Sequence, residues 1–221
     1  MKKKVLLSAF TFALLVAMGS IPALADSTLY DNTGPTSGGY NTGFTINNDY
    51  AVTDSFVLAS NSTLTGVSLI AWLNAGDTLT SVNWVITDTA FGSTTYGSGT
   101  ASVTGTYIGT DQKGYGLDLY QDTFSISGLS LAAGTYYLQL QNAVTAKGYY
   151  AYWVDSNGLS DAVQTKTGNL SGYNSVAGTH SETFQITGNA DTSATPEPSS
   201  FLLLGSGLAG LAGVIKRRLR A

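Results

Sequence analysis

The stretch Thr135–Asn142, TYYLQLQN, alternates apolar and polar side chains along its whole length. Its two sets of alternate positions are Tyr136, Leu138 and Leu140 against Tyr137, Gln139 and Gln141. Because successive side chains of a β-strand point to opposite faces, this period of two predicts a strand with one buried and one wet face. Strands of this kind are typical of antiparallel sheets that cover a core on one side only.

The same alternation recurs through the middle of the chain. Strand-like segments occur at Thr53–Ala59, Leu64–Leu73, Ser81–Asp88, Asp122–Ser127, Tyr149–Asp155 and Ser181–Gly188. Turn-forming Gly, Asn and Asp clusters separate these segments. Roughly eight to ten short strands with polar turns predict an all-β fold, an antiparallel β-sandwich of the jelly-roll kind. An immunoglobulin-like sandwich is the second choice, and a β-solenoid is the third because no fixed repeat period is present.

The beginning of the chain has the pattern of a signal peptide at residues 1–25. Lys2–Lys4 precede the apolar run Val5–Met18, and Ala23 and Ala25 form the small-x-small pattern after which signal peptidase cuts. We therefore expect export, cleavage after Ala25 and a mature chain that starts at Asp26.

The end of the chain combines an apolar run with a basic tip. Ser199–Ile215 carries no charge, and four basic residues follow it closely: Lys216, Arg217, Arg218 and Arg220. A helix of ~17 residues is the lower limit for crossing a bilayer, and flanking basic residues stay on the cytoplasmic side. The pattern predicts a transmembrane helix at 199–215, preceded by a spacer at residues 190–195. The β-sandwich domain is then expected at residues 26–189.

The tail at residues 196–221 also has a recognisable motif. Pro196, Glu197 and Pro198 stand before the glycine-rich apolar run and the arginine-rich tip. This combination resembles the PEP-CTERM sorting signal of Gram-negative bacteria. The resemblance implies that a membrane enzyme, exosortase, recognises the tail and cuts near Pro196–Pro198. It also implies inner-membrane anchoring before processing, then a place on the cell surface or outside it, in bacteria that secrete exopolysaccharide and form biofilms.

The charge of the exported part limits its partners. All 14 acidic residues lie between Asp26 and Glu197, against only Lys113, Lys147 and Lys166, which gives this part a net charge of −11 and no arginine. Nucleic-acid binding needs lysine and arginine to neutralise phosphates, so that class is excluded. The chain has no cysteine, which excludes disulfides, thiol catalysis and cysteine-bound metals. Neutral or cationic partners fit better.

A search for catalytic residues gives little. Glu182 is the one glutamate of the expected domain, and His180 is the one histidine, two positions earlier on the same strand face. Asp118 and Asp122 share a strand face but would lie about 13 Å apart, so we expect solvated strand residues there. A zinc site needs three or four ligands, and no nucleophile elbow of the Gly-x-Ser-x-Gly type occurs. We expect no enzyme and no cofactor; a carbohydrate-active enzyme with a site near His180 and Glu182 is the alternative.

Two short segments have some character of calcium-binding loops. They are Asp155–Gly158 and Asp31–Asn32, and neither has the ligand spacing of an EF-hand. Asp and Asn also form local turns with their own backbone, which is the preferred interpretation of both. We therefore predict no metal site.

The aromatic residues give the best candidate for binding. In KGYYAYWVD (Lys147–Asp155), Tyr150 and Tyr152 share one strand face, and Trp153 falls on the other. Exposed aromatic rings stack on sugars, while neighbouring polar groups donate and accept hydrogen bonds. Tyr150, Tyr152 and Trp153 are therefore the candidate carbohydrate-binding residues. The alternative is that Trp153 fills the core and the tyrosines only suit a strand. Trp72 is ambiguous, because its segment is apolar on both faces.

These observations favour an exported, non-catalytic surface or extracellular matrix protein. It would associate with exopolysaccharide or a biofilm through weak carbohydrate binding, after processing by signal peptidase and an exosortase-like enzyme. Apart from the enzyme hypothesis, a structural adhesin remains open. Ice binding is less favoured, because threonine pairs such as Thr78/Thr80 and Thr104/Thr106 follow no common repeat.

Overall fold

The computed structural model describes residues 26–34, 40, 42–158, 160, 162–167, 181–191, 205–208 and 215–218. The chain divides into two units, Met1–Ala190 and Asp191–Ala221, and each is described by itself. The predicted signal peptide with Ala23 and Ala25, the Pro196–Pro198 motif, His180 and Arg220 lie outside the described residues.

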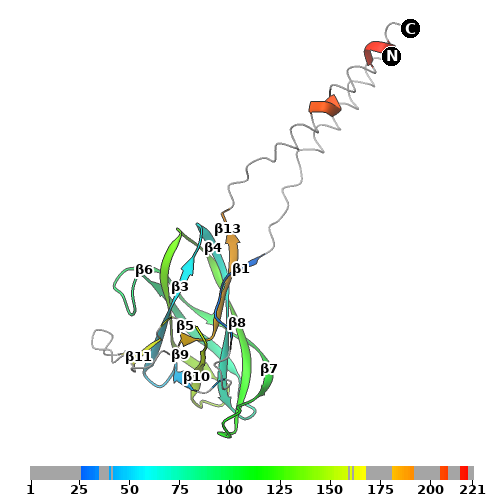
Figure 1. Cartoon of the computed structure of the whole chain (residues 1–221). Coiled ribbons are helices and arrows are strands. Elements are labelled where there is room, and N and C mark those ends of the chain that lie inside the picture. The colour runs from blue at the N-terminus through cyan, green and yellow to red at the C-terminus, as the bar shows by residue number, and fades with distance from the viewer. Residues whose placement is uncertain are drawn as a thin grey trace. The chain divides into compact units, whose positions relative to one another are not determined.

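The first unit contains a larger sheet of eight antiparallel strands (Figure 1). Its central strand is β4 (Ser62–Asn74), which pairs with β8 (Leu117–Leu131) along one edge and with β13 (Phe184–Ala190) and β10 (Ala151–Ser156) along the other. The outer members are β1 (Ser27–Asp31), β2 (Gly43–Thr45), β7 (Thr104–Thr110) and β12 (Ser181–Glu182).

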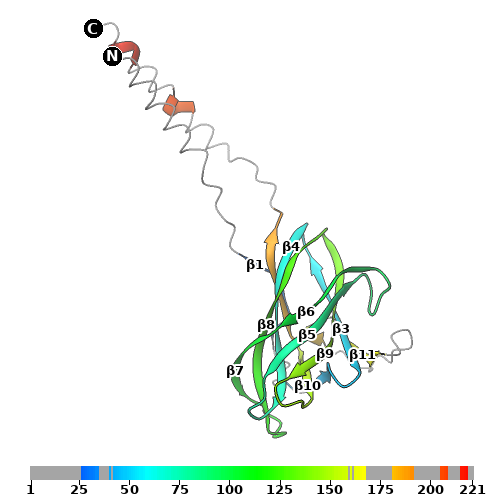
Figure 2. The ribbon, with the colours of Figure 1, turned by 180° about the vertical axis from the view of Figure 1, so that it is seen from behind.

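A smaller sheet of five antiparallel strands packs against it (Figure 2 gives the view from behind). Its order is β11 (Val163–Lys166), β3 (Tyr50–Leu58), β9 (Gly134–Thr145), β5 (Leu79–Thr87) and β6 (Thr95–Ser102). The prediction of an all-β, antiparallel sandwich is confirmed.

The core lies between the two sheets and follows the alternation of the sequence. On β9 the side chains of Tyr136, Leu138 and Leu140 are buried in it, as TYYLQLQN predicts. The opposite face of β9 is less wet than expected, because Gln139 is buried beside Thr53 on the neighbouring strand β3. A central strand is crowded by the side chains of both neighbours, which shields even its outer face.

The second unit is described only at residues 205–208 and 215–218, which are helical. No helix among the described residues has the length and apolar character needed to cross a membrane. Most of the transmembrane segment expected at Ser199–Ile215 lies outside the described residues, so it stays a prediction.

Candidate carbohydrate-binding face

The outer face of the larger sheet carries a second apolar cluster, separate from the core. Val67, Leu69 and Ala71 of β4 point into the core, so the alternate residues Ile70 and Trp72 must point outward. Four residues are buried in this outer cluster, Ile70, Trp72, Leu119 and Val154, and three more pack against it, Tyr40, Leu117 and Tyr152. The apolar character of both faces of β4 therefore has a structural cause.

An opening lies among these side chains, which we name the aromatic pocket. It has a volume of about 370 Å³ and is lined by Thr42, Gly43, Trp72, Tyr115, Leu117 and Tyr152. The register places Tyr152 directly opposite Trp72 on the paired strands β10 and β4. The Tyr115 ring meets the Trp72 ring edge-on, with 6.0 Å between centroids, and Tyr115 is 66% exposed. The pocket lining thus combines a buried aromatic ring, Trp72, with an exposed one, Tyr115.

The pocket also has an unused hydrogen-bond donor. The indole Nε1 of Trp72 is buried and has no hydrogen-bond partner among the described residues. A buried donor without an acceptor costs free energy, and such groups in native proteins call for an explanation such as a water or a ligand.

A stacked pair of tyrosines extends the pocket. The rings of Tyr150 and Tyr152 are 6.1 Å apart at an interplanar angle of 25°, and Tyr150 is 48% exposed. Burial, and then the neighbouring Tyr150, raise the pKa of the Tyr152 hydroxyl above its ordinary value. The hydroxyl therefore stays protonated at neutral pH, able both to donate and to accept a hydrogen bond.

Two of the three predicted aromatic residues lie on this face, and the third does not. Trp153 is 0% exposed and packs in the core against Phe184, with 5.4 Å between ring centroids. Its Nε1 donates a hydrogen bond of 2.7 Å to the Thr183 carbonyl oxygen. Trp153 has the strand parity of the core residue Ala151 and fills the core, as the alternative interpretation of this segment expects.

Sequence reasoning missed most of the pocket. The face of the strand on which Trp72 lies could not be assigned from the sequence, and no sequence pattern pointed to Tyr115 or Leu117 as binding residues. The available signal was the run of apolar residues on both faces of β4, which indicates that its outer face is also covered.

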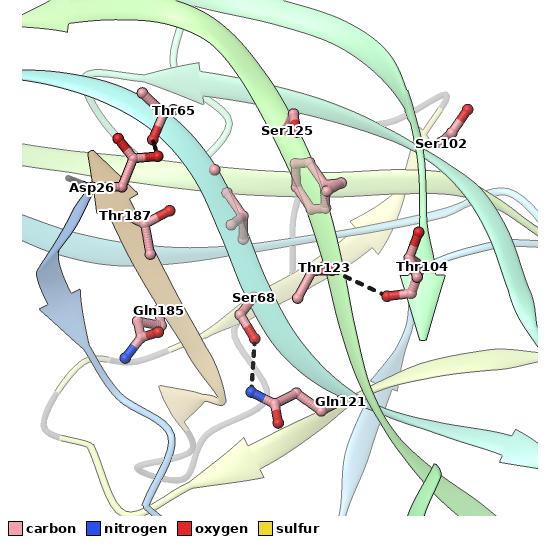
Figure 3. Close-up of a pocket in the computed structure, with 13 residues that line it drawn as sticks. Asp26, Thr65, Ser68, Ser102, Thr104, Gln121, Thr123, Ser125, Gln185 and Thr187 are labelled. Atoms are coloured by element: carbon pink, nitrogen blue, oxygen red, sulfur yellow. Dashed lines mark hydrogen bonds between the residues drawn. The ribbon is translucent and has the colours of Figure 1, made fainter. Parts of the chain in front are cut away.

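A second hollow lies on the same outer face, and we name it the polar hollow (Figure 3). It has a volume of about 410 Å³, and its side chains come mainly from β13, β4, β8 and the start of β7. The lining consists of Asp26, Thr65, Gly66, Val67, Ser68, Ser102, Thr104, Gln121, Thr123, Phe124, Ser125, Gln185 and Thr187. Hydroxyl and amide groups predominate, and Gln121 Nε2 donates to Ser68 Oγ at 3.2 Å.

Three carboxyl side chains form an interior cluster at one end of the sandwich. Asp155 and Glu182 are directly opposed on β10 and β12, and Asp54 of β3 accepts hydrogen bonds from Ser181 Oγ at 2.8 Å and from the Glu182 backbone N–H at 2.7 Å. All three are at most 1% exposed. Burial first, and then Asp54 and Asp155, raise the pKa of Glu182 well above its ordinary value.

This cluster bears on the enzyme and metal hypotheses. Glu182 is shielded from solvent, so a polysaccharide could not reach its carboxyl group in this conformation. No group of three or more histidine or acidic side chains among the described residues is arranged to hold a metal ion. At Asp31, one of the two calcium candidates, the carboxylate Oδ1 accepts from the Thr33 N–H at 3.0 Å, which is the expected local turn.

Asp122 departs from its expected place in solvent. Its side chain is 0% exposed, on the core side of β8, and neither carboxyl oxygen has a hydrogen-bond partner among the described residues. Burial raises its pKa to about 7. Gly105 lies opposite on β7, and a Cβ there would collide with the Asp122 carboxyl group. The missing side chain of Gly105 is what leaves room for this buried acid.

Comparison with known proteins identifies the tail of the chain. The family model of the PEP-CTERM protein-sorting motif matches residues 194–218. This range includes Pro196–Pro198 and Lys216–Arg218, whereas Arg220 lies beyond it. No curated protein matches the chain. The chain is therefore a PEP-CTERM protein, with the motif of proteins that are exported and sorted by an exosortase.

Proposed function

We propose that this exosortase-sorted protein is a non-catalytic component of the cell surface or extracellular matrix that binds neutral exopolysaccharide through its aromatic pocket. The observation that carries the proposal is the pocket itself, a hollow that is lined by the aromatic residues Trp72, Tyr115 and Tyr152. Aromatic walls with a few hydrogen-bonding groups are the usual lining of small-ligand sites and suit the apolar faces of sugar rings.

The charge of the chain supports a neutral ligand. None of the described residues that line the aromatic pocket is charged, and residues 26–197 have a net charge of −11. A polyanionic sugar would be repelled at long range, although salt screens this repulsion. Neutral glycans escape that penalty.

Removing the Trp72 ring is expected to weaken binding to neutral polysaccharide at least about tenfold, which corresponds to about 1.4 kcal/mol. The test is retention of the full chain, purified in detergent, on immobilised cellulose, β-1,3-glucan and mannan, with alginate as the acidic comparison. Trp72→Ala removes the aromatic wall of the pocket, whereas Trp72→Phe retains a smaller aromatic ring without the indole donor. Tyr152→Ala should weaken binding similarly.

The matched control is Tyr107→Ala, which removes a tyrosine that is also exposed but lies on β7 and lines neither hollow. It should bind like the unmodified chain. Lack of binding to every neutral polysaccharide, or equal binding by Trp72→Ala in a folded state, would refute the proposal.

A further inference from the structure

The aromatic pocket and the polar hollow share two strands of the larger sheet. Ser68 lines the polar hollow and Trp72 lines the aromatic pocket, four residues further along β4. On the antiparallel strand β8, Gln121 lines the polar hollow, and Leu117, four residues earlier, lines the aromatic pocket. A separation of four strand residues is about 13 Å, and side chains four apart point to the same face. The two hollows are therefore neighbours on one face.

The chemistry of the polar hollow matches the other part of a sugar, its hydroxyl groups. Its side chains are mostly hydroxyls and amides, which both donate and accept hydrogen bonds. Among the described residues that line it, Asp26 is the only charged one and none is a lysine. Anionic glycans or phosphates would find no cation there, whereas a neutral glycan would find many partners.

Among the described residues, the buried acids do not offer such a ligand a site. The interior carboxyl cluster is shielded from solvent, and no three of the described acidic or histidine side chains are arranged around a metal position. The outer face of the larger sheet thus combines apolar stacking and polar hydrogen bonding in adjoining hollows.

We propose that the two hollows are subsites of one extended site for a linear neutral glycan, which runs along β4 and β8. The inference rests on the proposed function and adds to it the length and direction of the ligand. Sugar units in the aromatic pocket stack on Tyr115 and Tyr152 above the buried Trp72. Units further along the glycan hydrogen-bond to Gln121, Thr123 and their neighbours. A single sugar ring does not cover the distance of about 13 Å between Ser68 and Trp72, so binding must depend on glycan length.

The test is isothermal titration of the full chain in detergent with a mono-, a di- and a hexasaccharide of the neutral polysaccharide that is retained best. The hexasaccharide is expected to bind more than about tenfold tighter than the disaccharide, beyond the up to fivefold statistical gain from its five disaccharide registers. In Gln121→Ala/Thr123→Ala this gain should fall to the statistical value, with disaccharide affinity unchanged. Both side chains are exposed, so their removal should leave folding intact.

The outcomes separate the two proposals. Trp72→Ala should weaken every glycan, because it removes the subsite that short ligands use. If wild-type affinity rises with length only by the statistical factor, or if the double variant weakens the disaccharide as much as the hexasaccharide, the extended site is refuted while the aromatic pocket stands. If no glycan binds the unmodified chain at all, both proposals fail.

Discussion

Raising the pH from 4 to 8 is expected to lower the midpoint of thermal unfolding by on the order of 10 °C, because Asp122 is buried without a counter-charge. Its pKa is about 7 in the folded chain, against 3.8 for an ordinary aspartate. A carboxyl group with a raised folded pKa favours the folded state only while it is protonated. Stability is thus lost as the pH rises from about 4 through about 7, and the total loss is about 4 kcal/mol.

Asp122→Asn should remove most of this dependence, because the amide has nearly the same shape and carries no charge at any of these pH values. Relative to the unmodified chain, the variant is expected to gain about 4 kcal/mol in unfolding free energy at pH 8 and little at pH 4. Thermal and urea unfolding at pH 4, 5, 6, 7 and 8 would measure the difference. A difference that is equal at pH 4 and pH 8 would show that Asp122 does not titrate as a buried acid.

Asp111→Asn provides a control with the opposite sign. Burial opposes ionisation of Asp111, but backbone N–H groups of Tyr115, Leu117 and Lys113 donate to its carboxylate and lower its pKa. A carboxylate with a lowered pKa stabilises the fold above pH 4 and loses that effect as the pH falls. The Asn variant should therefore be destabilised at neutral pH and approach the unmodified chain in acid.

The interior carboxyl cluster is expected to lower the stability of the fold as the pH rises, as Asp122 does. Burial raises the pKa of Asp54 in spite of its hydrogen bonds, and it raises that of Glu182 further with help from Asp54 and Asp155. Some pH dependence should therefore persist in Asp122→Asn. Glu182→Gln added to that variant is expected to reduce it again, and the same unfolding series would detect the change.

The fold could be predicted because alternation carries the needed information locally. The position of a residue in the alternating pattern is enough to assign its face of the strand. All four residues assigned to the core in this way are buried there: Leu138, Leu140, Phe184 and Ile186. The full arrangement of strands could not be obtained this way. β4 pairs with three strands from distant parts of the chain, and a period of two says nothing about which strand lies beside which.

Only part of the candidate site could be predicted from the sequence, for a related reason. Tyr150 and Tyr152 are close in the sequence, so they could be recognised as a cluster. Trp72 joins them only because β4 pairs with β10, and Tyr115 joins them because its ring contacts Trp72. The buried acids show a different failure. Asp54 shares parity with Phe56, and Asp122 shares parity with Phe124, so the pattern placed both on core faces. For Asp122 the general expectation that aspartate is solvated was given more weight than this pattern, and Gly105 on the neighbouring strand provides the space for its buried carboxyl group.

The largest effect of a single substitution is expected for Trp153→Ala, and it concerns stability, not binding. The substitution removes a fully buried ring from contact with Phe184 and leaves the Thr183 carbonyl oxygen without its indole donor. Loss of a buried tryptophan costs about 3–5 kcal/mol, and the unmade hydrogen bond adds about 1–3 kcal/mol. Because domains are stabilised by only about 5–15 kcal/mol, the variant should unfold far below the unmodified chain or fail to fold.

Two further variants separate the contributions of the Trp153 side chain. Trp153→Phe retains an aromatic ring in the core and loses the hydrogen bond to Thr183, so its loss should be intermediate in urea unfolding. Tyr150→Ala, on the same strand segment but half-exposed, should change the unfolding free energy by no more than about 0.5 kcal/mol. If Trp153→Ala instead kept its unfolding midpoint and lost affinity for glycans, the ring would have to contact the ligand. The opposite pattern is expected, because Trp153 lies in the core, whereas Tyr152 packs against the outer cluster and Tyr150 is half-exposed.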